Sequence, residues 1–192
     1  MSEVVQCDVC VIGAGSGGLS VTAGAAMLGA RTVLFESGKM GGECLNAGCV
    51  PSKALLAAAQ AARNVREAVR FGIGDSDARI DFPAVMAHVH DTIARIAPHD
   101  SVERFEGLGV RVIKAAARFV GPREVEGGGV RVQAKRIVIA TGSTAMIPPI
   151  PGIDEVAFLT NETIFSLDTR PDHLLIIGGG PISVEMAQAF RR

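Results

Sequence analysis

Tryptophan and tyrosine are absent from this 192-residue sequence, which contains eight phenylalanines. So few aromatic residues leave little material for a surface that stacks nucleic-acid bases. The formal net charge is −1, so the chain also lacks the basic excess typical of nucleic-acid-binding proteins. With 48% hydrophobic and 20% charged residues, the composition is that of a globular protein with one sizeable core, or of one domain and part of a second.

Charge is missing altogether between Asp8 and Arg31, and an uncharged run of this length raises the question of a membrane span. The run contains six glycines, two serines and a threonine, which dilute its apolarity. The residues before it include Glu3 and Asp8 rather than lysines, so it does not have the pattern of a secretory signal. We therefore expect a cytoplasmic protein with no membrane partner and no nucleic-acid partner.

The start of the chain has the pattern of a βαβ unit. An apolar strand pattern over residues 7–12 leads into a glycine cluster and a helix over residues 16–28, with Gly29 as its C-terminal cap. A second strand over residues 31–35 ends at Glu36. Strand, glycine turn, helix and strand together predict a parallel sheet.

Helices and then short strands are expected further along the chain. Helical spacing predicts helices over residues 51–71 and 81–97. The segment from Val110 predicts a small antiparallel meander that returns to a buried strand at residues 137–140. A last strand, over residues 174–177, should open a second glycine cluster and a helix. The runs assigned to the meander are VRVIKA, ARFV, GVRVQA and RIVIAT.

The first glycine cluster, VCVIGAGSGG, fits G-x-G-x-x-G at Gly13, Gly15 and Gly18. The pattern alone is weak, but here it follows a strand, opens a helix and is followed by Glu36 at the end of the next strand. Small residues let backbone N–H groups approach a pyrophosphate, and Glu36 can accept a hydrogen bond from a ribose hydroxyl. We interpret this segment as a dinucleotide site, the alternative being a structural turn.

The second cluster, LLIIGGGPIS, repeats the pattern at Gly178 and Gly180, with Pro181 at the first helical position. Ser183 stands where a third glycine is expected, at the point where helix and strand pack closely. Nucleotide binding and a structural turn are both possible interpretations of this segment, and we favour the first.

Cys7 and Cys10 form a C-x-x-C pattern, but both lie in the first predicted strand. Residues an odd number apart on a strand face opposite sides of the sheet, so these two thiols should not meet. We expect them to be buried structural cysteines, because free cysteine is among the most buried residue types.

Cys44 and Cys49 lie five positions apart in GGECLNAGCVPSK. In an ideal helix this spacing separates the Cα atoms by roughly 8.6 Å, too far for a disulfide, so a bond requires a break in the helix. Asn46 and Gly48 tolerate turns, and a helix N-terminus together with Lys53 would favour the thiolate of Cys49. A catalytic pair, a metal site and a static pair of buried thiols are the alternatives. Metal is the weakest, since His88 and His90 do not share a helix face.

Three motifs carry a resemblance: GGECLNAGCVPSK, RIVIATGS and LLIIGGGPISVE. Together they resemble the pyridine nucleotide-disulfide oxidoreductases, FAD enzymes that include dihydrolipoamide dehydrogenase, glutathione reductase and mercuric reductase. The resemblance implies an α/β fold: a Rossmann-like FAD-binding domain over residues 1–150 with a parallel sheet and an antiparallel β-meander, followed over residues 151–192 by the start of an NAD(P)-binding domain.

The resemblance also implies roles for individual residues. Cys49 would lie against the flavin, and Cys44 would be the outer thiol that exchanges with a small-molecule or protein disulfide. Lys53 would lie along the flavin and pair with Glu185, while Gly178 and Gly180 would belong to the NAD or NADP site. Residues implied to hold FAD are Gly13, Gly15, Gly18, Glu36, Gly41, Gly42, Lys53, Ala117, Thr141 and Gly142.

The sequence departs from the family pattern at Glu43, where threonine is common, at Ala115, where glycine is frequent, and at Ser183. It also ends before the residue that would separate NAD from NADP and before the interface domain of the homodimer. We therefore expect the N-terminal part of such an enzyme, which, if it keeps FAD, shows flavin absorbance but no NAD(P)H-dependent disulfide reduction of its own. The alternative is a short FAD-binding module without turnover.

Overall fold

The computed structural model describes residues 3–74 and 78–192. The chain divides into two compact units, each built from two separate segments. The sheet unit comprises Met1–Asn46 and Ile96–Thr144, and the helical unit comprises Ala47–Arg95 and Ala145–Arg192. Within the described residues, no helix combines the length and the apolarity needed to cross a bilayer.

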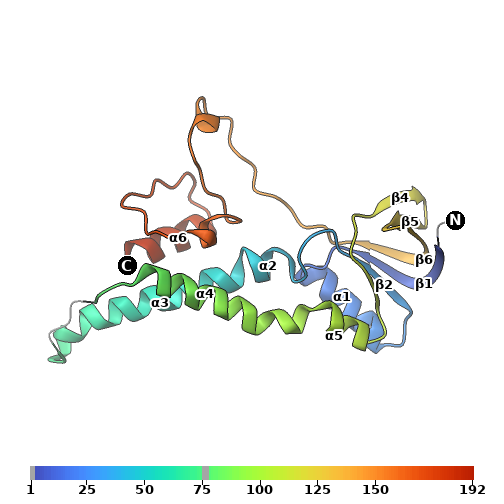
Figure 1. Ribbon diagram of the computed structural model, residues 1–192, viewed down its shortest axis with the longest axis horizontal. Coiled ribbons are helices and arrows are strands. Elements are labelled where there is room, and N and C mark those ends of the chain that lie inside the picture. Colours follow the sequence, from blue (N-terminus) through green and yellow to red (C-terminus); the bar gives the residue numbers. More distant parts are fainter. Residues whose placement is uncertain (1–2, 75–77) are drawn as a thin grey trace. The chain divides into compact units, whose positions relative to one another are not determined.

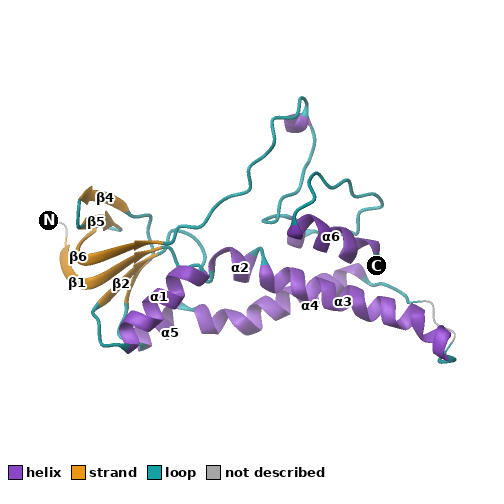
Figure 2. Cartoon of the chain, turned by 180° about the vertical axis from the view of Figure 1, so that it is seen from behind, coloured by secondary structure: helices purple, strands orange, loops and turns teal. Residues whose placement is uncertain are grey.

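The sheet unit is built on one six-stranded sheet with the order β3-β2-β1-β6-β5-β4 (Figures 1 and 2). The first four strands in that order are parallel, and β4 and β5 continue the sheet antiparallel. This confirms the predicted Rossmann-like sheet with an antiparallel meander. The strands are β1 (Glu3–Ile12), β2 (Thr32–Phe35), β3 (Arg111–Ile113), β4 (Arg118–Gly121), β5 (Glu124–Gly127) and β6 (Val130–Ile139).

Helix α1 (Ser16–Met27) joins β1 to β2 and packs on one face of the sheet through Leu19. It ends as predicted, because Gly29 has a φ of +80° and its N–H donates to the carbonyl of Ala26. The short helix α5 (Val102–Gly107), which the sequence did not predict, adds Phe105 to the same core. It follows the 3₁₀ turn η2 (Ala97–Asp100).

Four predictions about the β-rich segment were wrong. Strand β3 pairs in parallel with β2 rather than joining the meander, β5 had not been predicted, and residues 129–134 and 136–141 supply one continuous strand, β6. The end of that strand is also not buried, since Ile139 is 66% exposed. Local β-propensity indicates which residues can form a strand. The pairing partner of a strand and its direction depend on the neighbouring strands in the folded sheet.

The two thiols of Cys7 and Cys10 lie in one core cluster, not on opposite faces as predicted. The reason is an irregularity in β1: the amides of Asp8 and Val9 both donate to the carbonyl of Arg31. The side chains change face at this point, since Val5 and Cys7 before it and Cys10 and Ile12 after it all contribute to the same core cluster. Both thiols are buried as predicted, and burial raises the pKa of Cys7 to about 11 and that of Cys10 to about 12.

The helical unit is built around two long helices that run side by side, α3 (Cys49–Glu67) and α4 (Phe82–Ile96) (Figure 1). They confirm the predicted helices, with Pro83 in the first turn of α4 and the Asp81 side chain accepting the Ala84 amide. Helix α6 (Pro181–Arg191) packs against α3. Residues 3–74 and 78–192 also contain four 3₁₀ turns, three of them in this unit: η1 (Ala68–Phe71), η3 (Ile153–Glu155) and η4 (Ile164–Ser166).

The predicted strand at residues 174–177 is extended but is not a strand. Leu174 and Ile176 pack on the core of the helical unit, while Leu175 and Ile177 are 79% and 59% exposed. A parallel strand exists only with a neighbour to bond to, and none of the described residues pairs with this segment. The helix that follows begins at Pro181 as predicted.

Candidate functional site

The ends of the parallel strands bring the first glycine turn, Glu36 and Ala140 to one edge of the sheet. Three hydrogen bonds extend the ladder past the strands: Gly13 N–H to the Phe35 carbonyl at 2.8 Å, Glu36 N–H to that of Ile113 at 3.0 Å, and Ala140 N–H to that of Ile12 at 2.8 Å. In open α/β sheets ligands bind at this carboxyl edge, where the strand order reverses, here between β1 and β6.

Two of the three motif glycines are required by close backbone contacts. A Cβ on Gly13, which has a φ of +105°, would lie 2.3 Å from the carbonyl oxygen of Ala140. A Cβ on Gly18 would lie 1.8 Å from the carbonyl oxygen of Gly13, so only glycine lets helix α1 approach the strand this closely. Gly15 is the N-cap of α1, where the unpaired amides of the first turn favour an anion.

Glu36 lies at the predicted place and makes two contacts that the sequence did not reveal. One carboxylate oxygen accepts the amide of Ala14 at 2.6 Å, and the other accepts the amide of Gly38 at 2.5 Å. The Glu36 side chain therefore links the glycine turn at Ala14 to the loop at Gly38. Each carboxylate oxygen has a second lone pair, so the group can still accept from a ribose hydroxyl.

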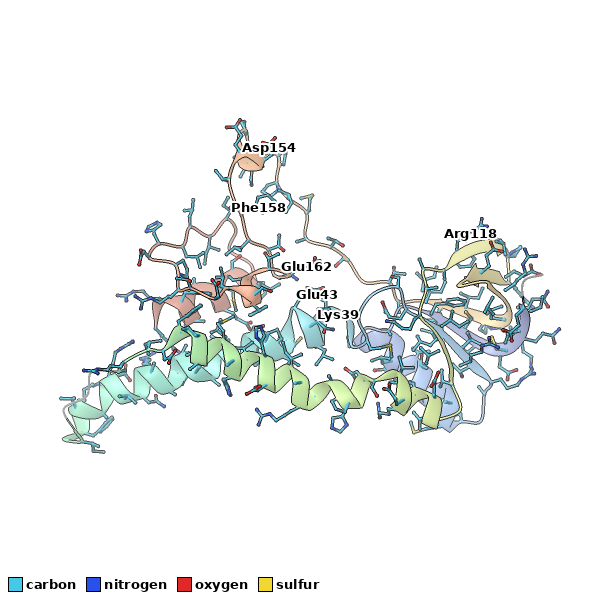
Figure 3. All side chains as sticks on the ribbon, viewed as in Figure 1. Lys39, Glu43, Arg118, Asp154, Phe158 and Glu162 are labelled. Atoms are coloured by element: carbon cyan, nitrogen blue, oxygen red, sulfur yellow. The ribbon has the colours of Figure 1, made fainter. Side chains whose placement is uncertain are left out.

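The Gly41–Gly42 turn packs directly on the glycine motif. Both residues have positive φ, +83° and +59°, and a Cβ on Gly42 would lie 2.5 Å from the Cα of Gly15. The amide of Gly41 donates to the carbonyl of Ala14 at 2.9 Å. Lys39 and Glu43 flank the turn, and both residues are exposed (Figure 3).

Thr141 and Gly142 continue from the contact between Ala140 and Gly13, and both are exposed. Ala117 packs against the core of the sheet unit, and its contact with a cofactor stays a prediction. Ala115 also packs on that core, beside Gly128.

Cys44 and Cys49 lie in two different helices, as a break between them requires. Cys44 is half-buried in α2 (Gly42–Asn46), and Cys49 is an exposed free thiol at the first residue of α3. The break falls at Ala47 and Gly48, and Gly48 adopts a φ of −135°, so the positive φ considered for it is not used.

Lys53 and Glu185 meet within the helical unit, as the resemblance implied. The Lys53 ammonium lies 2.5 Å from a carboxylate oxygen of Glu185, joining α3 to α6. Both side chains are partly exposed, so in the absence of a ligand the pair adds at most about 1 kcal/mol to stability.

The second glycine motif is more open than the first. Gly178 has a φ of +113°, but a Cβ there would come no closer than 3.5 Å to another atom, the Oγ of Ser183. Gly180 is the N-cap of α6. The predicted nicotinamide-dinucleotide site at these residues stays a prediction.

The histidines of α4 have structural surroundings. His90 contacts the carbonyl of Phe165 at 2.8 Å through Nε2, and His88 accepts through its backbone from Thr92. In the part of the chain that the structure describes, no group of three or more His, Cys, Asp or Glu side chains could hold a metal ion.

The sequence pattern of the family described as "Pyridine nucleotide-disulphide oxidoreductase" matches residues 7–192. This chain belongs to that family. The resemblance inferred from the three motifs is thereby confirmed.

Several named relatives support the assignment to the pyridine nucleotide-disulphide oxidoreductases. Mercuric reductase of Streptomyces lividans is 39% identical over 191 residues, covering 96% of this chain and 40% of the relative. Glutathione reductase of Burkholderia cepacia is 35% identical, covering 95% and 40%, and dihydrolipoyl dehydrogenase 1, mitochondrial, of Arabidopsis thaliana is 34% identical, covering 96% and 38%. The chain spans about two-fifths of the length of these relatives.

A solved structure shares the fold. The HOCl-induced flavoprotein disulfide reductase RclA from Escherichia coli matches with a TM-score of 0.80 and 26% identity, covering 95% of this chain and 39% of that one. The geometry of the sheet edge fits a member of this family. Glycines stand at the positions where a Cβ would collide with neighbouring backbone atoms, so the backbone there is free of side chains.

Proposed function

We propose that this chain is the N-terminal part of an FAD-dependent NAD(P)H:disulfide oxidoreductase. The observation that carries the proposal is the close backbone packing at the sheet edge. Gly13, Gly18 and Gly42 each lie where a Cβ would come within 2.5 Å of a backbone atom. Such packing leaves amides and no side chains facing the start of α1, which is the surface a dinucleotide pyrophosphate needs.

The residues that would hold FAD come from three segments of the sheet unit. The first turn of α1 offers unpaired amides to the pyrophosphate, and Glu36 offers its remaining lone pairs to the ribose. The Gly41–Gly42 turn and Thr141–Gly142 border the same edge. When bound, FAD would carry an electron pair between a nicotinamide and a disulfide.

The thiol pair would pass those electrons on by disulfide exchange. Two electrons and two protons convert a Cys44–Cys49 disulfide to two thiols. The Cys44 thiolate then attacks a substrate disulfide, releasing one substrate thiol and forming a mixed disulfide. Cys49 attacks the Cys44 sulfur, the second substrate thiol leaves, and the Cys44–Cys49 bond is restored. The sum is one disulfide reduced to two thiols per NAD(P)H oxidised.

Lys53 and Glu185 would stand beside the flavin in this scheme. Glu185 fixes the position of the Lys53 ammonium, which would otherwise sample many rotamers on its flexible stem. A fixed positive charge there would stabilise negative charge that develops on a bound electron carrier.

Titration of the chain with FAD, followed by quenching of flavin fluorescence, tests the cofactor assignment. We expect saturable binding that Gly42→Ala reduces at least tenfold, because its Cβ would overlap Gly15. Gly109→Ala is the matched control, since Gly109 has a φ of +81° in the same unit with open space around its Cβ. Equal FAD affinity for both variants, or a parent chain that binds no FAD, would contradict the assignment.

Serine variants in the full-length protein test the thiol roles. Cys44→Ser should abolish disulfide reduction while NAD(P)H still reduces the flavin. Exposure alone would favour Cys49 as the thiol that meets substrate, so retained disulfide turnover in Cys44→Ser would reverse the two roles. A full-length protein that binds FAD and shows no disulfide turnover would support the alternative, an FAD-binding module.

A further inference from the structure

The Gly41–Gly42 turn is held in a conformation that needs an external constraint. Two successive residues with positive φ are favourable only for glycine, and glycine has the most conformational freedom to lose on folding. Within the turn itself, the amide of Gly42 reaches the Lys39 carbonyl only at 3.3 Å. A contact from outside the turn is therefore needed to hold it against Gly15.

The side chain of Asn46 supplies that constraint. Its Nδ2 donates to the carbonyl of Met40 at 3.0 Å and to the carbonyl of Gly42 at 2.8 Å. Both N–H donors of the amide are thus used on the two carbonyls that flank Gly41. Because both partners are pure acceptors, the orientation of the amide is fixed by its surroundings.

The same residue connects the turn to the cysteine helix. Asn46 is the last residue of α2, the helix that carries Cys44, and α2 begins at Gly42. The Gly41 amide in turn bonds to the Ala14 carbonyl, in the centre of the first glycine motif. The Asn46 side chain therefore ties the end of α2 to the turn, and the Gly41 amide ties the turn to the glycine motif.

We propose that Asn46 is a positioning residue that locks the Gly41–Gly42 turn on the dinucleotide cradle and thereby sets the affinity of the chain for FAD. This inference rests on the proposed function for the identity of the ligand, but the lock itself is a property of the protein alone. Asparagine is required rather than aspartate, because a carboxylate would face two carbonyl oxygens without a proton to donate.

The test compares Asn46→Asp and Asn46→Leu with the parent chain by FAD titration at about pH 8 and about pH 5. At pH 8 we expect both variants to bind FAD at least tenfold more weakly. At pH 5 Asn46→Asp should recover part of the loss relative to the parent, because two facing carbonyl oxygens disfavour the carboxylate and raise its pKa, and a protonated carboxyl donates one hydrogen bond. Asn46→Leu, which has no donor, should recover none.

Asn64→Asp is the matched control. Asn64 accepts from Gln60 through its side-chain oxygen on α3, and aspartate keeps that acceptor. The control should follow the parent at both pH values. Parent-like FAD affinity in Asn46→Asp and Asn46→Leu, or equal recovery of the two at pH 5, would overturn the proposal.

Hydrogen exchange at the Gly41 amide separates this inference from the proposed function. Exchange without ligand should be at least tenfold faster in Asn46→Asp than in the parent at pH 8, since the turn opens more often. If the parent binds no FAD but the exchange still accelerates, the cofactor assignment fails and the lock stands. Unchanged exchange at Gly41 would remove the lock whatever the chain binds.

Discussion

The two glycine-rich segments of this chain align residue for residue, yet they differ in how they are built. Gly13, Gly15 and Gly18 correspond to Gly178, Gly180 and Ser183 at a constant offset. In the first segment the preceding residues form β1, which pairs with strands on both sides. In the second they are extended and, within the described residues, have no strand beside them.

The contacts at the glycines differ in the same way. A Cβ on Gly18 would collide with the carbonyl of Gly13 at 1.8 Å, while the serine at position 183 comes no nearer than 3.5 Å to a Cβ built on Gly178. The pattern of strand, glycines and helix thus encodes the turn and the helix start in both segments. The close packing that makes glycine obligatory depends on neighbouring strands, which only the first segment has in the structure.

The largest contrast we expect is in thiol reactivity at the equivalent positions Cys10 and Leu175. Cys10 is fully buried, and burial raises its pKa to about 12, whereas Leu175 is 79% exposed. In a background without Cys44 and Cys49, the cysteine of Leu175→Cys should react with a disulfide reagent at about pH 8 at least a thousandfold faster than Cys10, because only a thiolate reacts. The reaction is followed by release of the coloured thiol, and similar rates would show that both segments are equally open.

Exchanging the third position of the motif should separate the two segments by stability. Gly18→Ser places a side chain into the junction of α1 and β1 and should cost about 3 kcal/mol or more. Ser183→Gly removes a side chain from an uncrowded helix and should cost only about 0.5 kcal/mol through lower helix propensity. Urea unfolding followed by circular dichroism measures both. A Gly18→Ser variant as stable as the parent would refute the close packing.

How far the sequence alone predicts these segments follows from the same contrast. Residue patterns located α1, its cap at Gly29, the long helices and the glycine turns, because those depend on residues close in the chain. Beyond the first βαβ unit, the pairing of strands could not be predicted in this way. Residues 174–177 and β1 have the same apolar pattern, and β3 was assigned to the wrong side of the sheet.

The candidate site was predictable to the same extent. Lys53 and Glu185 meet as implied, although 132 positions separate them, because the family resemblance carries long-range information that periodicity lacks. The brace from Glu36 to Ala14 and the lock by Asn46 were not foreseen, since each is a side-chain to backbone bond whose partner depends on the folded turn. The common face of Cys7 and Cys10 was missed because no residue pattern marked the irregularity at Asp8.

The first glycine of each motif offers a matched pair in which only the surroundings differ. Gly13 and Gly178 have nearly the same φ, +105° and +113°, so alanine carries a similar conformational penalty at both, on the order of 1–3 kcal/mol. Gly13→Ala also overlaps the Ala140 carbonyl and should cost about 1–2 kcal/mol more. Hydrogen exchange of the α1 and α6 amides reads the two sites separately. Equal losses would mean that backbone conformation alone requires these glycines.

The smallest effect concerns the residue five positions before each first glycine, Asp8 in the first segment and His173 in the second. Asp8 anchors β1 by contacts with Lys135 at 2.7 Å and with the Arg31 amide at 2.9 Å, and these lower its pKa from 3.8 to about 2. A lowered carboxyl pKa stabilises the fold above about pH 4, and this contribution disappears as the pH falls through 2.

Asp8→Asn should therefore lower the urea midpoint slightly at pH 7, by an amount that shrinks below pH 4. The exposed His173→Asn is the control, and a difference between Asp8→Asn and the parent that stays constant with pH would show that the anchoring contacts do not depend on the carboxylate charge.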